Sequence, residues 1–266
     1  MVIKKKTPFK SGYNEIVDRN GENKNMKLDF GILVLKMGES YKCSLSLERA
    51  FLLISGKVTL NWDEETCKVS RDCPLDDNPI CLHVPKSVNV EIIAHKDSEI
   101  CVERCENDKI FPSKLFKAED IKTEVFGEGV LNDASKRSVR TIFDGETDPL
   151  SNMVMGEVIN HPGRWSSYPP HDHPQPEIYY YKLFPDQGFG ISILEDEATV
   201  VNSGDASLIV PGDTHSQVAA PGYAMYYVWM IAHLENDRWL PTTRYFKEQH
   251  KWLLEKDVKI WPEKKF

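Results

Sequence analysis

The 266-residue sequence has no long apolar run. Its longest such stretch, AMYYVWMIA over residues 224–232, is too short to cross a bilayer as a helix, which takes about 20 residues. The opening MVIKKKTPFKSGYNE is basic but continues into polar residues, so it lacks the apolar segment of a secretory signal. We therefore expect a cytoplasmic protein with no membrane partner.

An excess of positive charge is also missing. The formal net charge is -8, and no dominant cluster of Lys and Arg is present. Nucleic-acid binding needs Lys and Arg gathered on one face, so a nucleic-acid partner is not expected. A small molecule with one carboxylate remains compatible, because one or two local Arg or Lys residues are enough to pair with it.

Cysteine is absent from the second half of the chain. The six cysteines are at positions 43, 67, 73, 81, 101 and 105, and none forms a CxxC pair. Because the chain shows no secretory signal, we expect free thiols in a reducing compartment rather than disulfides. Such cysteines usually act as small buried apolar residues.

Helical periodicity is scarce, and short alternating runs dominate. Turn residues separate these runs every ten or so positions, which is typical of β-sandwiches and β-barrels. A helix is expected only near the C-terminus, from Tyr245 to Ile260, where it would cover a sheet. The expected strands are 30–36, 49–54, 57–62, 80–84, 88–94, 99–104, 137–143, 153–160, 177–184, 188–194, 198–201, 206–210 and 223–231.

The two halves of the chain look alike. A Gly turn and a Pro-marked turn recur in each half, with Ser55-Gly56 expected to join two strands as a hairpin. A charged stretch over residues 114–136 separates the halves. We predict an all-β protein with two barrel or jelly-roll lobes, residues 1–120 and 121–266. Exposed sheet edges should be paired or covered, which predicts close lobe packing and a homo-oligomer.

Residues that bind metals cluster in the second half. His171, His173 and Glu177 share one parity, so in an extended chain their side chains would face the same way. His215 follows the turn at Pro211-Gly212 and supplies a fourth ligand. Three imidazoles and one carboxylate suit Zn, Fe, Mn, Co or Ni, and open coordination positions would make the site catalytic. We predict one divalent metal ion there, and none in the first half, which lacks an HxH pair.

Polar residues near this motif are candidates for substrate contacts. Tyr179 and Tyr181 continue the parity of Glu177, so we expect both to line the same cavity and offer hydroxyl groups. A substrate carboxylate would need a cation, for which Arg164 and Arg244 are preferred. Lys182 has the opposite parity and is expected to point outward. Arg140 is the remaining cation near the motifs.

The metal motif leads to a family resemblance. HxHxxxE followed by Pro-Gly-x-x-His resembles the paired motifs of cupins. The strings WSSYPPHDH, EIYYYKLFPDQGFG and GDASLIVPGDTHSQVAAPGYAMYYVWMIAH, with the Arg238-Trp239 pair, resemble the 5-deoxyglucuronate isomerase family of inositol catabolism over roughly residues 137–254. That family is related to the 5-keto-4-deoxyuronate isomerases of pectin breakdown. The acidic insert that many members carry between HxH and Glu is shortened here to Pro174-Gln175-Pro176.

The resemblance implies a bicupin aldose-ketose isomerase with its metal in the C-terminal lobe. The matching ligands would be His171, His173, Glu177 and His215, holding zinc or manganese as a Lewis acid. The implied substrate is a uronate-type sugar acid, 5-deoxy-glucuronate, converted to 5-dehydro-2-deoxy-gluconate. The general base stays open between a tyrosine, a lysine and a metal-bound hydroxide. The alternatives are a 5-keto-4-deoxyuronate isomerase, a metal-dependent cupin dioxygenase and a non-catalytic sugar-binding bicupin.

Overall fold

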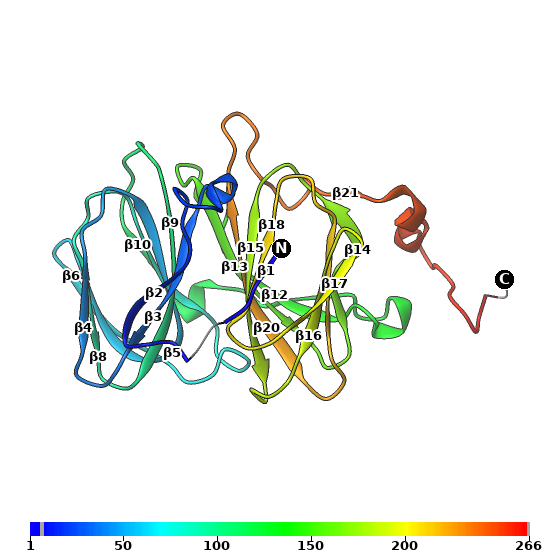
Figure 1. Ribbon diagram of the computed structural model, residues 1–266, viewed down its shortest axis with the longest axis horizontal. Coiled ribbons are helices and arrows are strands. Elements are labelled where there is room, and N and C mark those ends of the chain that lie inside the picture. Colours follow the sequence, from blue (N-terminus) through cyan, green and yellow to red (C-terminus); the bar gives the residue numbers. More distant parts are fainter. Residues whose placement is uncertain (6–7, 265–266) are drawn as a thin grey trace.

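The computed structural model describes residues 1–5 and 8–264 as two β-lobes that lie side by side (Figure 1). The described helical elements are short 3-10 segments: η1 (Lys24–Met26), η2 (Ala118–Asp120), η3 (Leu131–Asp133) and η4 (Glu248–Leu254). Within these residues, no helix has the length and apolar character needed to cross a membrane. The expectation of an all-β chain with a short C-terminal helix is therefore confirmed.

The N-terminal lobe is a nine-stranded antiparallel sheet that curls around its longest strand, β5. The first part of β5 pairs with β7 and β9, and its second part pairs with β6 and β8. Apolar side chains, including Leu33, Phe51, Leu82 and Val102, fill the interior. The strands are β2 (Gly12–Val17), β3 (Asp29–Leu35), β4 (Ser40–Cys43), β5 (Glu48–Trp62), β6 (Glu65–Arg71), β7 (Ile80–Val84), β8 (Val90–Ala94), β9 (Ser98–Cys105) and β10 (Lys114–Phe116).

The C-terminal lobe has two antiparallel sheets. The seven-stranded sheet has the order β1-β18-β15-β20-β13-β12-β11, and the five-stranded sheet has the order β17-β16-β19-β14-β21. The strands are β1 (Val2–Ile3), β11 (Glu124–Phe126), β12 (Arg137–Phe143), β13 (Met153–Asn160), β14 (Trp165–Asp172), β15 (Glu177–Phe184), β16 (Gly190–Leu194), β17 (Glu197–Val201), β18 (Ala206–Ile209), β19 (His215–Ala219), β20 (Ala224–Ala232) and β21 (Tyr245–Phe246).

The N-terminal strand β1 lies with the second lobe. Val2 pairs with Ser207 on β18, which covers the edge of the seven-stranded sheet. The predicted boundary between residues 120 and 121 falls at η2, between β10 of the first lobe and β11 of the second. The chain thus begins in the sheet of the second lobe, although its first residues precede the first lobe in sequence.

Two local expectations were wrong. Ser55-Gly56 is not a hairpin turn, because β5 runs through it with a register shift between Leu53 and Ser55. Gly56 has a φ of +116°, and a Cβ there would collide with Ser98, so glycine marks a bulge rather than a turn. The C-terminal helix is also shorter than expected, since the 3-10 helix covers only Glu248–Leu254 and buries no residue.

The lobes pack face to face through a shared apolar core. Phe30, Leu52 and Cys101 from the first lobe cluster with Tyr180 and Met230 from the second. The Sγ of Cys101 lies 3.8 Å from the sulfur of Met230. All six cysteines are free thiols, as expected, and four of them are buried: Cys43, Cys81, Cys101 and Cys105.

Two buried charge clusters join the lobes across this core. Glu157 accepts two hydrogen bonds from Arg71, of 2.6 and 2.8 Å, and neither side chain has any solvent exposure. In the second cluster, His83 donates to Glu48 at 2.8 Å and to Asp148 at 3.0 Å. His83 therefore links the two lobes through Asp148, which accounts for its burial in the first lobe.

The His83 cluster predicts a pH dependence of stability. Burial opposes the charge on His83, but the hydrogen bonds to Asp148 and Glu48 outweigh it and raise the pKa of the imidazole. Because the folded-state pKa exceeds the unfolded value of about 6.5, the stabilisation is complete below about pH 6.5 and is lost as the pH rises through the folded-state pKa. The urea midpoint of the wild type should therefore decrease as the pH rises above neutral, whereas the midpoint of His83→Gln should decrease less.

Urea titrations of the two proteins from about pH 6.5 to about pH 9 measure this difference. Subtracting the variant cancels other groups that titrate in the same range, such as the terminal amine. Parallel pH profiles would contradict a charged His83 between the lobes.

Candidate metal centre and cavity

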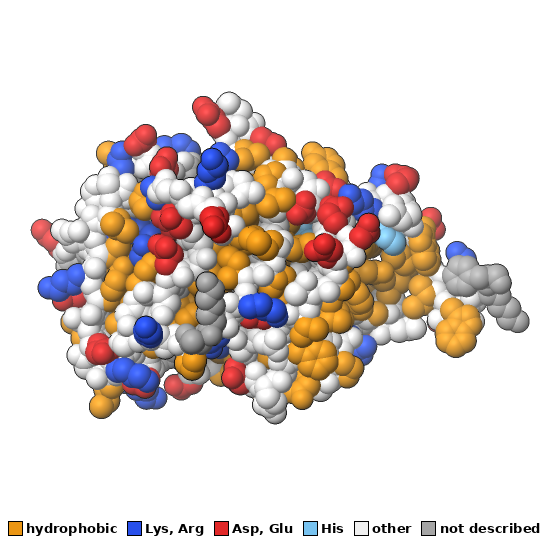
Figure 2. Space-filling model, in the orientation of Figure 1, with side chains coloured by type: hydrophobic (Ala, Val, Ile, Leu, Met, Phe, Trp, Pro, Cys, Tyr) orange, Lys and Arg blue, Asp and Glu red, His pale blue; other side chains and the backbone are white. Residues whose placement is uncertain are grey.

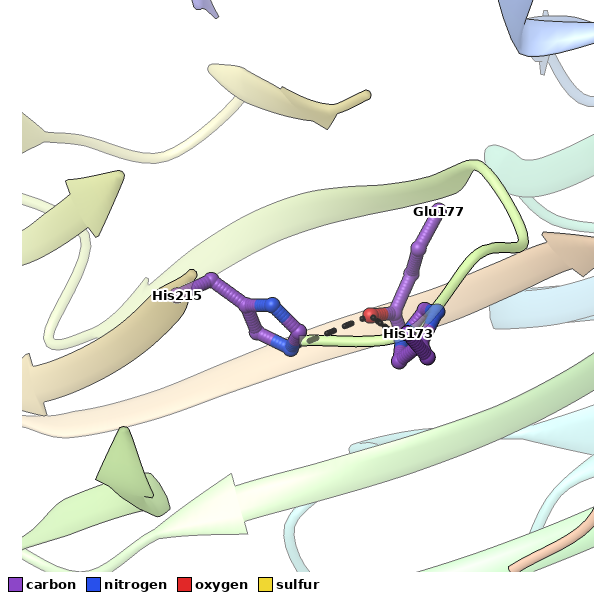
Figure 3. A group of neighbouring side chains, drawn as sticks. All are labelled: His173, Glu177 and His215. Atoms are coloured by element: carbon purple, nitrogen blue, oxygen red, sulfur yellow. Dashed lines mark hydrogen bonds and ion pairs between the residues drawn. The ribbon is translucent and has the colours of Figure 1, made fainter. Parts of the chain in front are cut away.

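Three of the four predicted ligands converge inside the C-terminal lobe (Figure 3). His173 follows β14, Glu177 begins β15 and His215 begins β19. One ligand atom from each of the three lies within 4.8 Å of the others. The Oε2 atom of Glu177 is 3.2 Å from Nε2 of His173 and 3.3 Å from Nε2 of His215. All three side chains are buried, so the group is held in a fixed arrangement.

His171 lies beside this group without joining it. Its Cα pairs with that of His215 across β14 and β19, and the two ring centroids are 4.7 Å apart. The ring centroid of His173 is farther away, at 6.5 Å. The ring of Phe246 also packs near His171, with a centroid separation of 5.4 Å. The structure therefore places the fourth predicted ligand next to the converging three.

Backbone carbonyls fix the tautomer of each histidine. The Nδ1 atoms of His171, His173 and His215 lie 3.1, 2.9 and 3.3 Å from the carbonyl oxygens of Pro169, Gln175 and Asp213, respectively. A carbonyl only accepts, so each Nδ1 carries the proton and each Nε2 keeps its lone pair. Histidines that bind metals are usually oriented by a second hydrogen bond of this kind.

The residues fit a divalent metal ion on chemical grounds. The buried Nε2 of His215 has no hydrogen-bond partner, which leaves its lone pair free. Burial lowers the pKa of His171 and of His215 to about 3, so both imidazoles are neutral near pH 7, the form that binds metals. Two imidazoles and a carboxylate that face one another in the interior otherwise leave polar atoms poorly paired. A cation among them would satisfy these atoms.

A cavity of about 380 Å³ adjoins the three converging residues. This volume is typical of small-molecule sites. Its walls come from both sheets of the lobe and from the segment that follows β20. Besides the four histidine and glutamate residues, the lining includes Glu124, Phe126, Arg137, Val139, Thr141, Val158, Ser167, Tyr168, Pro169, Tyr179, Tyr227, Trp229, Trp239, Pro241, Arg244, Phe246 and Leu254.

The predicted tyrosines have different positions. Tyr179 lines the cavity, and its hydroxyl lies 3.0 Å from Oγ of Ser167. Tyr181 is not among the lining residues. Its hydroxyl is hydrogen-bonded within the lobe, at 2.9 Å from Ser207 Oγ and 2.6 Å from Gln217 Oε1. Tyr179 and Tyr181 lie two residues apart and share the inner face of the sheet, but only Tyr179 reaches the cavity.

The predicted cations also separate. Arg244 lines the cavity from the segment after β20, whereas Arg164 is not part of the lining. Arg140 lies in the lobe interface, where it donates to the carbonyl oxygens of Pro74 and Asp77. Lys182 pairs with Glu99 of the first lobe at 2.6 Å, outside the cavity as its parity predicted.

Several lining residues were not predicted from the sequence. Tyr227 and Trp229 alternate on β20, and Arg137 shares a face with Val139 and Thr141 on β12. Both strands were expected, so the alternation of side chains along them could have indicated that these residues share a face. Ser167 and Tyr168 gave no such signal, because β14 was not expected around Pro169 and Pro170, where the strand is irregular.

Known proteins are similar to this chain in sequence and in fold. The model of the KduI/IolB family matches residues 1–253. A 5-deoxy-glucuronate isomerase from Bacillus licheniformis is 30% identical over 253 residues, which cover 86% of this chain and 88% of the relative. An IolB-like protein from Salmonella typhimurium has a crystal structure with a TM-score of 0.81 and 22% identity, covering 93% of this chain and 97% of that one.

A cupin 2 conserved barrel domain protein from Leptotrichia buccalis has a TM-score of 0.51 and 14% identity, with coverage of 86% and 92% of the two chains. This likeness bears on the fold alone, and with the two curled lobes it confirms the expected bicupin architecture. The family model covers nearly the whole chain, including both lobes and every residue of the convergent group. The chain therefore belongs to the KduI/IolB family.

Proposed function

We propose that the protein is a metal-dependent aldose-ketose isomerase that converts 5-deoxy-glucuronate into 5-dehydro-2-deoxy-gluconate. The observation that carries this proposal is the cavity beside a buried His-Glu group in a chain of this family. The curated relatives named as 5-deoxy-glucuronate isomerases support the choice of substrate. The reaction moves hydrogen between adjacent carbons of a sugar acid without net oxidation.

His173, Glu177 and His215 would hold the ion, with His171 as the adjacent fourth ligand. We propose zinc or manganese, since both accept imidazole and carboxylate ligands. A divalent ion bound there polarises the substrate carbonyl and stabilises the negative charge that develops when the neighbouring carbon loses its proton.

Tyr179 is proposed to donate a hydrogen bond to a substrate oxygen. Burial raises the pKa of its hydroxyl well above the ordinary value, so the group stays protonated near neutral pH. This favours a donor over a general base. The Trp229 and Trp239 rings, with centroids 5.4 Å apart, line the same cavity and exclude water from the reacting carbons.

Replacing Tyr179 with Phe should therefore lower kcat by about tenfold to a hundredfold. This loss is at or somewhat below the lower end of the effect of a positioned general acid or base. The bound metal should remain, because the tyrosine is not among the proposed ligands. Steady-state kinetics and elemental analysis of the variant measure both effects.

Tyr180→Phe is the matched control, since the Tyr180 hydroxyl faces the first lobe and donates to Glu99 at 2.9 Å. A Tyr179→Phe protein with the kcat of Tyr180→Phe would contradict the assigned role.

A substrate panel tests the proposed function. The metal-loaded protein is incubated separately with 5-deoxy-glucuronate and with 5-keto-4-deoxyuronate, and loss of substrate is followed by NMR. Preferential turnover of 5-deoxy-glucuronate is expected. Faster turnover of 5-keto-4-deoxyuronate would reassign the substrate, and turnover of neither would reject the isomerase in favour of a binding bicupin or another cupin reaction.

We also propose a homo-oligomer. The C-terminal segment projects beyond the body of the second lobe (Figure 1), and apolar side chains are exposed along it (Figure 2). Trp261 is 73% exposed, and Tyr245 and Leu254 are also exposed. Apolar side chains on a projecting segment support contact with another copy of the chain.

A further inference from the structure

We propose that Arg137 binds the carboxylate of the substrate and makes the cavity selective for sugar acids over neutral sugars. This inference deepens the proposed function and rests on it, because it names the residue that recognises the acid group. Arg137 is the first residue of β12 and was not a candidate in the sequence. It lines the cavity together with the convergent His-Glu group.

Neighbouring groups fix the position of the Arg137 side chain. Its Nη1 donates to the carbonyl oxygen of Ser135 at 2.9 Å. The guanidinium carbon lies 5.6 Å from the centre of the Phe126 ring, which is opposite Arg137 on the paired strand β11. These contacts hold one edge of the guanidinium against the cavity wall and restrict its rotation. A guanidinium held in this way loses little further freedom when it binds an anion.

Arg137 has fewer partners than three buried arginines, Arg49, Arg71 and Arg140. Arg71 forms a two-pronged pair with Glu157. Arg49 donates to four backbone carbonyl oxygens, and Arg140 donates to carbonyl oxygens and a threonine. Arg137 has no ion pair and no second hydrogen bond among the residues the structure describes. Its remaining N–H groups are thus available to a ligand.

An unpaired cation in a half-buried position is costly, and a substrate carboxylate would relieve that cost. Burial lowers the pKa of Arg137, and the nearby charge of Arg244 acts in the same direction. Both arginines line one cavity, and neither has an anionic partner within the part of the chain that the structure describes. A two-pronged arginine-carboxylate pair is the strongest common way to hold such a group.

The two arginines have different roles in this arrangement. Arg137 is half-buried, whereas Arg244 is exposed at the cavity. Charge interactions are stronger where less water screens them, so Arg137 is the residue that sets the specificity. Arg244 adds attraction for an approaching anion. With the acid group at Arg137, Tyr179 and the His-Glu group are left for the rest of the sugar in the same cavity.

Calorimetric binding of D-glucuronate and D-glucuronamide to the metal-loaded protein tests this inference. The two probes differ only in a carboxylate and a neutral amide, so their affinity ratio reports acid recognition. We expect wild type to prefer the acid by about thirtyfold or more, as for a charge-assisted pair shielded from water. Arg137→Met should abolish the preference by weakening glucuronate binding while leaving glucuronamide binding nearly unchanged.

Arg137→Gln is a second neutral variant, and either variant decides the result if the other fails to fold. Lys136→Met is the matched control, because it removes one positive charge next to Arg137 from a side chain that pairs with Glu128 outside the cavity. Its acid preference should equal that of wild type. In turnover of 5-deoxy-glucuronate, the neutral Arg137 variants should raise KM more than they lower kcat.

An acid preference that persists in a folded neutral variant would overturn the inference and leave the isomerase intact. A wild type that turns over 5-deoxy-glucuronate but binds both probes equally would do the same. Failure to turn over any uronate would instead overturn the proposed function, whereas an acid preference lost only in the Arg137 variants would still identify an acid-binding residue.

Discussion

Turnover should fall by about a thousandfold or more when His215 is replaced by alanine, and the bound metal should be lost with it. The Nε2 of His215 lies 3.3 Å from Glu177, so its removal opens the convergent group. The lost charge stabilisation amounts to several kcal/mol, and each 1.36 kcal/mol corresponds to a factor of ten in rate. Elemental analysis and steady-state kinetics on the same preparation measure both losses.

Folding should survive this change, because the core of the lobe is apolar and does not depend on the metal. His250→Ala is the matched control, since His250 lies on η4 and is not part of the cavity lining. It should keep about one ion per chain and full activity. Retention of both metal and turnover in His215→Ala would contradict the proposed metal centre.

Loss of one charge between the lobes should have the largest effect on stability. Glu157→Gln should lower the free energy of unfolding by about 3–5 kcal/mol, because it leaves the Arg71 guanidinium buried without its counter-ion. The hydroxyl of Tyr226, 2.5 Å from Glu157, would also lose its charged acceptor. Urea unfolding followed by circular dichroism and tryptophan fluorescence measures the change.

Glu99→Gln provides the comparison, since its pair with Lys182 also joins the lobes but both side chains are about one-fifth exposed. It should cost about 1 kcal/mol or less. Equal stabilities of the two variants would show that the Arg71–Glu157 pair is not the dominant charge contact of the interface.

Residue spacing predicted the centre of the site because its residues lie on short, nearly extended segments. Glu177 and Tyr179 lie two residues apart on β15, so the period of two puts both side chains on the same face of the sheet. His215 was predicted from its position after a turn, and β19 does bring it beside His171. Local sequence therefore indicated most of the residues of the convergent His-Glu group.

The remaining walls depend on contacts between distant segments. Trp239 and Arg244 reach the cavity only because the chain after β20 folds back over it. Arg137 is 34 residues from His171 in sequence, and no local pattern shows that its usual partner, a carboxylate, is missing. The bulge at Gly56 likewise depends on the approach of Ser98 from another strand. Residue spacing within one segment does not predict contacts between residues that are distant in sequence.

Anaerobic incubation of the metal-loaded protein with 5-deoxy-glucuronate, followed by NMR, tests the central claim most directly. Aldose-ketose isomerisation has no net redox change, so the aldehyde signal should disappear and 5-dehydro-2-deoxy-gluconate should accumulate at the same rate with and without oxygen. Absence of this product in both conditions, or turnover that stops when oxygen is removed, would contradict the assignment as a sugar-acid isomerase.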